Sequence, residues 1–273
     1  LIENEVIMKK ILSIGGSDTS GGGGIEADIK TFERYNEFNV VAIENIVTMN
    51  PNNWQVAQYP MPTETFSAQL QTTLSITLAG IKVGMISDIN NFNILIDYLE
   101  TAKFGMLLVD PVMATKLTIA HDKTIDLTTY KKKLLSKADI VTPNVLEAAL
   151  LTDVQSINNV SEMKEAAKKI YDYGVKNVVI KSGNRFADGL ATDLLYDGTN
   201  FEVFQNEIIK TDYNHGAGCT FSAAILANMV KNNAISASVK EAKEFTFQAV
   251  ANAIQLNQFV GHVWQGDNHY ETT

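Results

Sequence analysis

Residues 214–224, Asn-His-Gly-Ala-Gly-Cys-Thr-Phe-Ser-Ala-Ala, combine groups that can bind an anion with one that can accept a proton. Gly216 and Gly218 flank a tight turn, Cys219 follows, and the small and apolar residues 221–229 indicate a helix. A glycine-rich turn that opens a helix presents backbone N–H groups at the positive end of the helix dipole. Such a turn can bind a phosphate, or stabilise the negative charge that develops during phosphoryl transfer. An ordinary loop-to-helix junction is the alternative interpretation of the Gly-Ala-Gly triplet.

A second glycine cluster lies near the N-terminus, with six glycines among the ten residues 15–24. It follows an apolar stretch, 10–14, that indicates a buried strand. It precedes residues 25–32, whose apolar side chains have helical spacing. Open α/β sheets bind ligands in such loops, at the carboxyl ends of their strands. The cluster fits neither the Walker pattern nor the dinucleotide-binding fingerprint, and a flexible surface turn is the alternative.

Composition narrows the class of protein. The chain has 273 residues, 45% hydrophobic and 19% charged, which is ordinary for one globular α/β domain. Its net charge of −9 would repel a nucleic-acid backbone. The single cysteine excludes an internal disulfide and fits a reducing cytosol, so a cytoplasmic location is expected. No apolar run has the length of a membrane span, and no signal-peptide pattern is present.

Strand-like and helix-like segments alternate along the chain, which implies a parallel sheet covered on both faces. The expected strands are 10–15, 40–47, 79–83, 105–109, 138–142 and 177–181. The expected helices are 25–36, 64–76, 89–102, 124–135, 145–151, 161–173, 217–231 and 237–256. Strand-like residues 191–196 and 201–205, joined by Asp197-Gly198-Thr199-Asn200, predict an appended antiparallel hairpin.

Several short motifs, spread over roughly residues 10–262, together resemble the ribokinase-like superfamily. Within it, the chain is most similar to the vitamin kinases that act on hydroxymethylpyrimidine and pyridoxal, and in detail to the pyridoxal kinases that look like the pyrimidine kinase. The matching motifs are Gly16-Ser17-Asp18, Ala27-Asp28-Ile29-Lys30-Thr31-Phe32, Ile46-Val47-Thr48-Met49, Ile81-Lys82-Val83-Gly84-Met85, Val109-Asp110-Pro111-Val112-Met113, Val141-Thr142-Pro143-Asn144 with Glu147-Ala148, Ile180-Lys181-Ser182-Gly183 and His215-Gly216-Ala217-Gly218-Cys219-Thr220.

The resemblance implies a fold, an activity and partners. The fold is a three-layer α/β/α with a mostly parallel central sheet, and residues 8–273 are expected to form one kinase domain, with 1–7 left outside it. The activity is phosphorylation of the 5'-hydroxymethyl group of pyridoxal or a related B6 vitamer, with ATP and Mg²⁺. The expected partners are small molecules and a second copy in a homodimer, with no nucleic acid and no membrane.

The resemblance assigns the catalytic anion site to Gly216, Ala217, Gly218 and Cys219. Cys219 is expected to act as the base, or at least to contact the acceptor hydroxyl. A thiol normally titrates at about pH 8.5, and a helix N-terminus is expected to lower that value. The alternative is a small buried residue that closes the turn.

Asn144 and Glu147 lie three apart at an expected strand-to-helix junction, so their side chains point the same way. Their oxygens suit Mg²⁺, although a helix N-cap with a glutamate in the first turn explains the same spacing. Asp110 is expected to contact the metal through water, or simply to end its strand. Lys181, with Gly183 in the same motif, is expected at the ATP phosphates, with a solvated strand end as its alternative.

The resemblance places the acceptor pocket at Asp18, Gly23, Met49, Met85 and Val112. An aromatic ring needs flat apolar walls and a few polar groups for direction. Asp18 could instead cap a turn, and the methionines could be plain core. Pyrimidine kinases of the family tend to carry a polar residue at the position of Met49, so this methionine favours a B6 vitamer.

One departure concerns the segment after Met113. The pyridoxal kinases resembled here usually carry a second cysteine on a lid, and Thr115 stands at that position. Thr115 cannot form the hemithioacetal that would trap an aldehyde, so the preference among B6 vitamers stays open. His121 could contact a ligand from the lid or lie in an exposed loop, and His215 could touch a phosphate or pack the turn.

Three other functions remain as alternatives. Hydroxymethylpyrimidine or phosphomethylpyrimidine kinase of thiamin biosynthesis is the alternative within the same branch. A sugar or nucleoside kinase of this fold is disfavoured, because those enzymes carry an aspartate where Cys219 stands. A vitamer-binding protein without turnover is suggested by the altered lid and opposed by the retained Cys219, Glu147 and Lys181.

Overall fold

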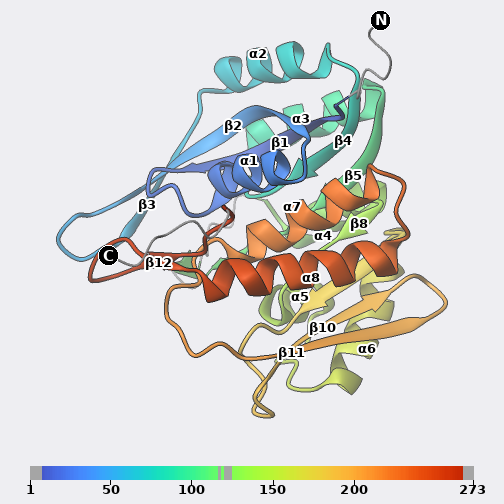
Figure 1. Ribbon diagram of the computed structural model, residues 1–273. Coiled ribbons are helices and arrows are strands. Elements are labelled where there is room, and N and C mark those ends of the chain that lie inside the picture. The colour runs from blue at the N-terminus through green and yellow to red at the C-terminus, as the bar shows by residue number, and fades with distance from the viewer. Residues whose placement is uncertain (1–7, 116–117, 120–124, 267–273) are drawn as a thin grey trace, which may run out of the picture.

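The protein is described by a computed structural model that covers residues 8–115, 118–119 and 125–266. Its centre is a nine-stranded sheet with the strand order β11-β10-β9-β8-β5-β4-β1-β2-β3 (Figure 1). The sheet contains β1 (Lys10–Asp18), β2 (Phe38–Met49), β3 (Val56–Pro60), β4 (Leu78–Val83), β5 (Phe104–Val109), β8 (Ile140–Val141), β9 (Asn177–Lys181), β10 (Leu190–Tyr196) and β11 (Phe201–Glu207). The six middle strands, in the order β2, β1, β4, β5, β8 and β9, pair in parallel, while β3, β10 and β11 join the ends of the sheet antiparallel.

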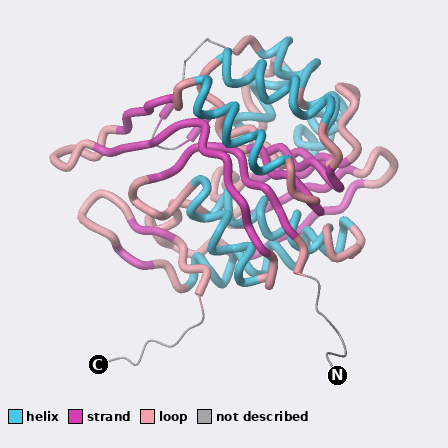
Figure 2. The backbone as a smooth tube through the Cα atoms, turned by 90° about the horizontal axis from the view of Figure 1, so that it is seen from above, coloured by secondary structure: helices cyan, strands magenta, loops and turns pink. Residues whose placement is uncertain are grey.

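Helices cover both faces of this sheet, so the molecule has three layers (Figure 2). One face is covered by α1 (Gly24–Arg34), α7 (Ala217–Met229) and α8 (Ile235–Ala251). The other face is covered by α2 (Thr63–Leu74), α3 (Ile89–Thr101), α4 (Leu127–Lys133), α5 (Val145–Thr152) and α6 (Val160–Tyr171). The α/β/α architecture expected from the sequence is confirmed.

Burial explains why the central strands are mostly apolar. Residues Ile11–Ile14 of β1 are all buried, as expected for a strand covered on both faces. The α7 helix is buried nearly all round because it packs between the sheet and its neighbours α1 and α8. Its small residues let those elements approach closely.

The structure differs from the expected elements in three places. Residues 56–60 form β3, an edge strand that pairs with the extended β2, and the sequence analysis placed no strand there. The expected helix 237–256 ends at Ala251, because the chain turns at Asn252 into the short β12 (Ile254–Gln255) that pairs with β13 (Gly261–His262). The expected helix 124–135 is α4 within the described residues, followed by a 3-10 turn, Leu135–Lys137.

Two smaller features complete the fold. The strands β6 (Ala114–Thr115) and β7 (Thr118–Ile119) pair with each other outside the main sheet. Among the described residues, no helix combines the length and the apolar character that crossing a bilayer requires.

Candidate active site

The turn before α7 fits only glycine at its first position. Gly216 has a φ of +87° and caps the helix, and a Cβ there would lie 1.8 Å from the carbonyl oxygen of Gly22. The two glycine clusters of the sequence therefore meet backbone to backbone. Cys219 lies in the first turn of α7, whose positive end faces the glycine run. The structure thus brings together the two motifs that are some two hundred positions apart in the chain.

Asp18 holds the glycine run in place. Its Oδ1 accepts hydrogen bonds from the amide and the hydroxyl of Ser20, at 2.8 and 2.7 Å. Its Oδ2 accepts from the amide of Gly23 at 2.7 Å and lies 2.6 Å from Nε2 of His215. Burial alone would raise the pKa of Asp18, but the hydrogen bonds from His215 and Ser20 outweigh it and hold the pKa below its ordinary value. The turn-capping role is confirmed, and contact with a substrate stays a prediction.

His215 joins the two glycine clusters. Besides its contact with Asp18, its ring lies 5.2 Å from that of His262, measured between centroids, and the backbones of the two histidines pair as an isolated bridge. Turn packing, one of the two roles expected for His215, is confirmed. His215 also lines the cavity described below, so phosphate contact stays a prediction.

Asp110 and Lys181 form an ion pair at 2.9 Å where β5 and β9 end. The hydroxyls of Thr142 and Ser222 also donate to the Asp110 carboxylate, each at 2.9 Å. Burial would raise the pKa of Asp110, but Lys181 and Lys82 outweigh it and lower the pKa. Ser222 lies in α7, so this carboxylate ties the anion turn to the sheet.

Asn144 and Glu147 form a capping box at the start of α5. The Asn144 side chain accepts from the amides of Leu146 and Glu147, at 2.9 and 3.1 Å. The Glu147 carboxylate accepts from the amides of Asn144 and Met113, at 2.8 and 3.2 Å. The capping interpretation is confirmed, and a metal role for the same two side chains stays a prediction.

The thiol of Cys219 departs from its expected ionisation. We expected the helix N-terminus to lower its pKa, but burial raises the pKa of Cys219 to about 11. Lys82 and the Gly24 amide favour the thiolate, whereas Asp110 and Asp28 oppose it. The expectation of a lowered thiol pKa is therefore wrong for this structure, because desolvation, Asp110 and Asp28 together outweigh Lys82 and the Gly24 amide.

One cavity of about 510 Å³ collects the candidate residues. Every residue assigned from the sequence lines it: Asp18, Gly23, Met49, Met85, Val112, Asp110, Asn144, Glu147, Lys181, Gly183, Gly216, Ala217, Gly218 and Cys219. Met49 also accepts a long contact from the Thr19 hydroxyl, with 3.9 Å between oxygen and sulfur. The side chains of Thr115 and His121 lie outside the described residues, so the lid hypothesis stays a prediction.

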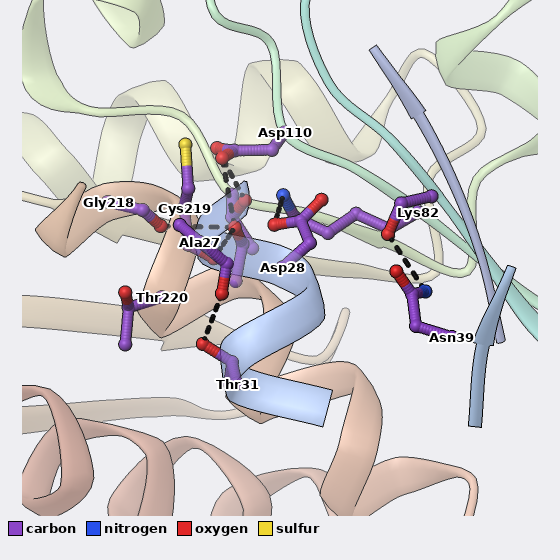
Figure 3. A network of polar contacts seen from close by, with 12 residues as sticks. Ala27, Asp28, Thr31, Asn39, Lys82, Asp110, Gly218, Cys219 and Thr220 are labelled. Carbon is purple, nitrogen blue, oxygen red and sulfur yellow. Dashed lines mark hydrogen bonds and ion pairs between the residues drawn. The ribbon is translucent and has the colours of Figure 1, made fainter. Parts of the chain in front are cut away.

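The structure adds two groups of cavity residues that the sequence analysis did not assign. Asp28 and Lys82 form a buried ion pair at 2.6 Å beside Cys219 (Figure 3). A lysine inside the apolar strand β4 was a visible signal for this pair. The second group comes from the end of β11 and from α8, and it gave no signal because its spacing is that of ordinary core: Ile208, Ile209, Lys243, Thr246, Phe247 and Val250.

The donor set decides how a divalent cation could be held. Among the described residues, no three His, Cys, Asp or Glu side chains are arranged to bind a metal ion by themselves. Glu147 and Asp110 nevertheless bring two carboxylates to the cavity wall. Mg²⁺ commonly keeps several waters and uses phosphate oxygens, so this donor set fits Mg²⁺ that arrives with a nucleotide.

This sheet, with its anion turn, carboxylates and lysine at the carboxyl ends of the strands, defines a small-molecule kinase of ribokinase-like architecture. The sequence profile of the phosphomethylpyrimidine kinase family matches residues 18–264. The chain is 38% identical to a pyridoxine kinase of Bacillus subtilis, over 93% of this chain and 94% of the relative. It is 35% identical to a hydroxymethylpyrimidine/phosphomethylpyrimidine kinase of Haemophilus influenzae, over 93% of this chain and 95% of the relative.

Solved structures agree with the sequence comparisons. The pyridoxal kinase of Staphylococcus aureus, in complex with AMP-PCP and pyridoxal, superposes with a TM-score of 0.89. It is 37% identical, covering 95% of this chain and 94% of the other. The chain belongs to the phosphomethylpyrimidine kinase family.

Proposed function

We propose that this protein is a pyridoxal kinase, which transfers the γ-phosphate of ATP to the 5'-hydroxymethyl group of pyridoxal or a related B6 vitamer. The observation that carries the proposal is that one cavity joins Cys219 and its anion turn to the apolar wall at Met49. The likeness to a pyridoxine kinase and to a pyridoxal kinase that was solved with pyridoxal and an ATP analogue supports it.

The nucleotide phosphates would bind at the start of α7. Backbone N–H groups of the turn would stabilise the charge that develops on the transferred phosphoryl group. Lys181 lies beside them, since a Cβ on Gly218 would be 3.7 Å from its Nζ. Mg²⁺ would neutralise phosphate charge, with Glu147 and Asp110 as the residues that hold its waters.

The acceptor would bind between the glycine run and the methionines. Met49, Met85 and Val112 give the apolar walls that an aromatic ring requires. Cys219 would lie at the hydroxyl that reacts and, in its thiolate form, would accept its proton. Positioning of the hydroxyl in line with the γ-phosphate supplies much of the rate enhancement in reactions of this kind.

Hydroxymethylpyrimidine kinase is the second candidate, favoured by the family profile and by the Haemophilus influenzae relative. The two candidates differ at Met49, whose sulfur and methyl group offer an aminopyrimidine only a weak hydrogen-bond acceptor. An apolar wall at this position supports the vitamer.

The test is a coupled ATP-consumption assay with Mg²⁺ on pyridoxal, pyridoxine, pyridoxamine and hydroxymethylpyrimidine side by side. We expect the highest kcat/KM on a B6 vitamer and no ATP consumption without an acceptor. Turnover confined to the pyrimidine would replace the proposal with the second candidate. If none of the four compounds causes ATP consumption, the result would support a binding protein without turnover.

We also propose a homodimer and a cytoplasmic location. The edge strand β3 supports the first, because an open strand edge with Tyr59 at 58% exposure is a surface that a second copy could cover. Sedimentation at twice the chain mass of 30.0 kDa is the expected result, and sedimentation as a monomer would contradict it. The single cysteine supports the cytoplasmic location, because a chain without a disulfide fits a reducing compartment.

A further inference from the structure

Four charged side chains from four different elements surround the thiol of Cys219. Asp28 comes from α1, Lys82 from β4, Asp110 from the residue that follows β5, and Lys181 from β9. Figure 3 shows three of them, Asp28, Lys82 and Asp110, in one cluster with Cys219. All four act electrostatically on the thiol or are acted on by it. These charges therefore modulate how readily this cysteine loses its proton, on top of the burial that raises its pKa.

The Asp28–Lys82 pair is the more deeply buried of the two ion pairs. The side chains are 5% and 2% exposed, and Lys82 Nζ lies 2.6 Å from Asp28 Oδ1. Placing a lysine inside an apolar strand is unfavourable unless its charge is paired. Burial raises the pKa of Asp28 to about 6 even though Lys82 favours the carboxylate. A pair of well-packed apolar side chains would hold these elements together without this penalty.

The two ion pairs differ in what else they bind. Asp110 and Lys181 are tied to hydroxyls of Thr142 and Ser222, and this pair joins α7 to the sheet. The Lys82 ammonium donates a hydrogen bond to Asp28 Oδ1 at 2.6 Å. Lys82 is also the strongest of the charges that favour a thiolate at Cys219. Asp28 therefore sets the position of the Lys82 ammonium, and the charge of that ammonium acts on the Cys219 thiol.

We propose that Asp28 and Lys82 are a positioning pair for the reaction: Lys82 supplies the positive charge that stabilises the Cys219 thiolate, and Asp28 holds Lys82 in place and moderates its charge. The catalytic consequence rests on the proposed function. In the step concerned, which starts from the Cys219 thiolate, the acceptor O–H bond breaks and its proton forms an S–H bond with the thiolate sulfur. The oxygen electron pair attacks the γ-phosphorus, and the bond to the bridging oxygen breaks with its electrons leaving on ADP.

The two members of the pair should act on the thiol in opposite directions. Cys219 is the only cysteine in the chain, so the rate of its alkylation by iodoacetamide between pH 7 and 11 reports its ionisation without any labelling. We expect Lys82→Met to slow alkylation at a fixed pH. Asp28→Asn keeps an Oδ1 acceptor that can hold Lys82 but removes the opposing negative charge, so we expect it to accelerate alkylation. Each shift of one pKa unit changes the rate by about tenfold below the thiol pKa. The proposal would be overturned if the alkylation rate changes in the same direction in both variants, or if it changes in neither.

A double variant and a matched control keep the result interpretable. A single substitution leaves one buried charge uncompensated and could unfold the protein. Asp28→Asn combined with Lys82→Met removes both charges at nearly constant volume. We expect its alkylation to be slower than wild type, because Lys82 acts on the thiol more strongly than Asp28. Alkylation indistinguishable from wild type would overturn the proposal even if neither single variant folds.

The control is a third lysine–aspartate pair of the cavity, Lys243 and Asp193, at 2.8 Å. We expect Lys243→Met to leave the pH dependence of Cys219 alkylation unchanged, and an equal shift would overturn the specific role of Lys82. Steady-state kinetics give a second readout: Lys82→Met should lower kcat and leave both KM values nearly unchanged. Alkylation needs no turnover, so failure of this inference and failure of the proposed kinase activity are distinguishable.

Discussion

Gly216 at the start of α7 lies against Gly22 in the glycine run, so closely that a Cβ on Gly216 would be 1.8 Å from the Gly22 carbonyl oxygen. This contact fixes the anion turn relative to the loop that carries Asp18 and Gly23. The distance leaves no room for a side chain at Gly216, and its φ of +87° is unfavourable for any residue with a Cβ. The geometry of the site therefore depends on glycine at this position.

The variant Gly216→Ala tests that dependence. We expect turnover to fall by about 100-fold or more, because a displacement of about 1 Å at a reacting centre has effects of that size. Backbone strain should also lower the free energy of unfolding by about 1–3 kcal/mol. Turnover with Mg-ATP and pyridoxal, and urea unfolding, measure the two effects.

Gly189 provides the matched control. It also has a positive φ, +77°, but a Cβ there would have nothing within 4 Å. Gly189→Ala should lower the free energy of unfolding by about 1 kcal/mol and leave turnover intact. Equal activity of the two alanine variants would contradict the role given to the anion turn.

Glu147 is expected to hold waters of Mg²⁺, and Glu147→Gln separates this role from helix capping. Glutamine keeps one oxygen acceptor for a backbone amide but removes the negative charge. We expect the Mg²⁺ concentration for half-maximal activity to rise by about tenfold, the effect typical of groups that orient metal ligands from outside the coordination shell. An unchanged Mg²⁺ requirement would refute the assignment. Glu162→Gln is the control, since Glu162 accepts from the Asn158 amide at 2.7 Å beside the start of α6 and lies outside the cavity.

Asp18 should make the protein less stable in acid. Burial opposes its ionisation, but His215 and Ser20 hold its folded pKa below the unfolded value of about 3.9. Its contribution to stability is therefore present above about pH 4 and is lost as the pH falls through the folded pKa. We expect Asp18→Asn to reduce the free energy of unfolding by about 1–3 kcal/mol at pH 7. The difference from wild type should shrink below pH 4, and a constant difference from pH 7 to pH 2.5 would contradict this account.

Met49 is expected to set the choice of acceptor. A glutamate at this position could accept a hydrogen bond from an aminopyrimidine and would remove the apolar wall. We expect Met49→Glu to shift the ratio of kcat/KM for hydroxymethylpyrimidine over pyridoxal by about tenfold toward the pyrimidine. Met49→Leu, which keeps an apolar side chain of similar volume, should keep the wild-type ratio. An unchanged ratio in Met49→Glu would show that another residue sets the specificity.

Local patterns were sufficient to predict most of the architecture. The central strands are apolar runs bounded by polar loops, and the capping box at Asn144 and Glu147 is visible in the spacing of two residues. Edge strand β3 was missed because half-exposed residues such as Val56 and Tyr59 carry no continuous apolar run. It is identified by its pairing with β2, which is a long-range property.

The cavity could be predicted only in part for the same reason. The roles of the glycine turns and the single cysteine can be inferred from neighbouring residues in the sequence. The role of Asp28 and Lys82 depends on their ion pair, which forms only when α1 packs against β4. The raised pKa of Cys219 likewise follows from burial and from neighbours on other elements. Sequence spacing predicted the helix terminus beside the thiol, and the desolvation that outweighs it appears only in three dimensions.

The most direct measurement is product formation by wild type and Cys219→Ala, with pyridoxal and Mg-ATP, together with the affinity of each protein for pyridoxal. We expect wild type to form pyridoxal 5'-phosphate and ADP in equal amounts, as resolved by ³¹P NMR. Cys219→Ala should bind pyridoxal with nearly unchanged affinity and lose most of its turnover. Phosphorylation by Cys219→Ala at the wild-type rate would contradict the role of this cysteine, and the absence of pyridoxal 5'-phosphate with wild type would contradict the proposed activity.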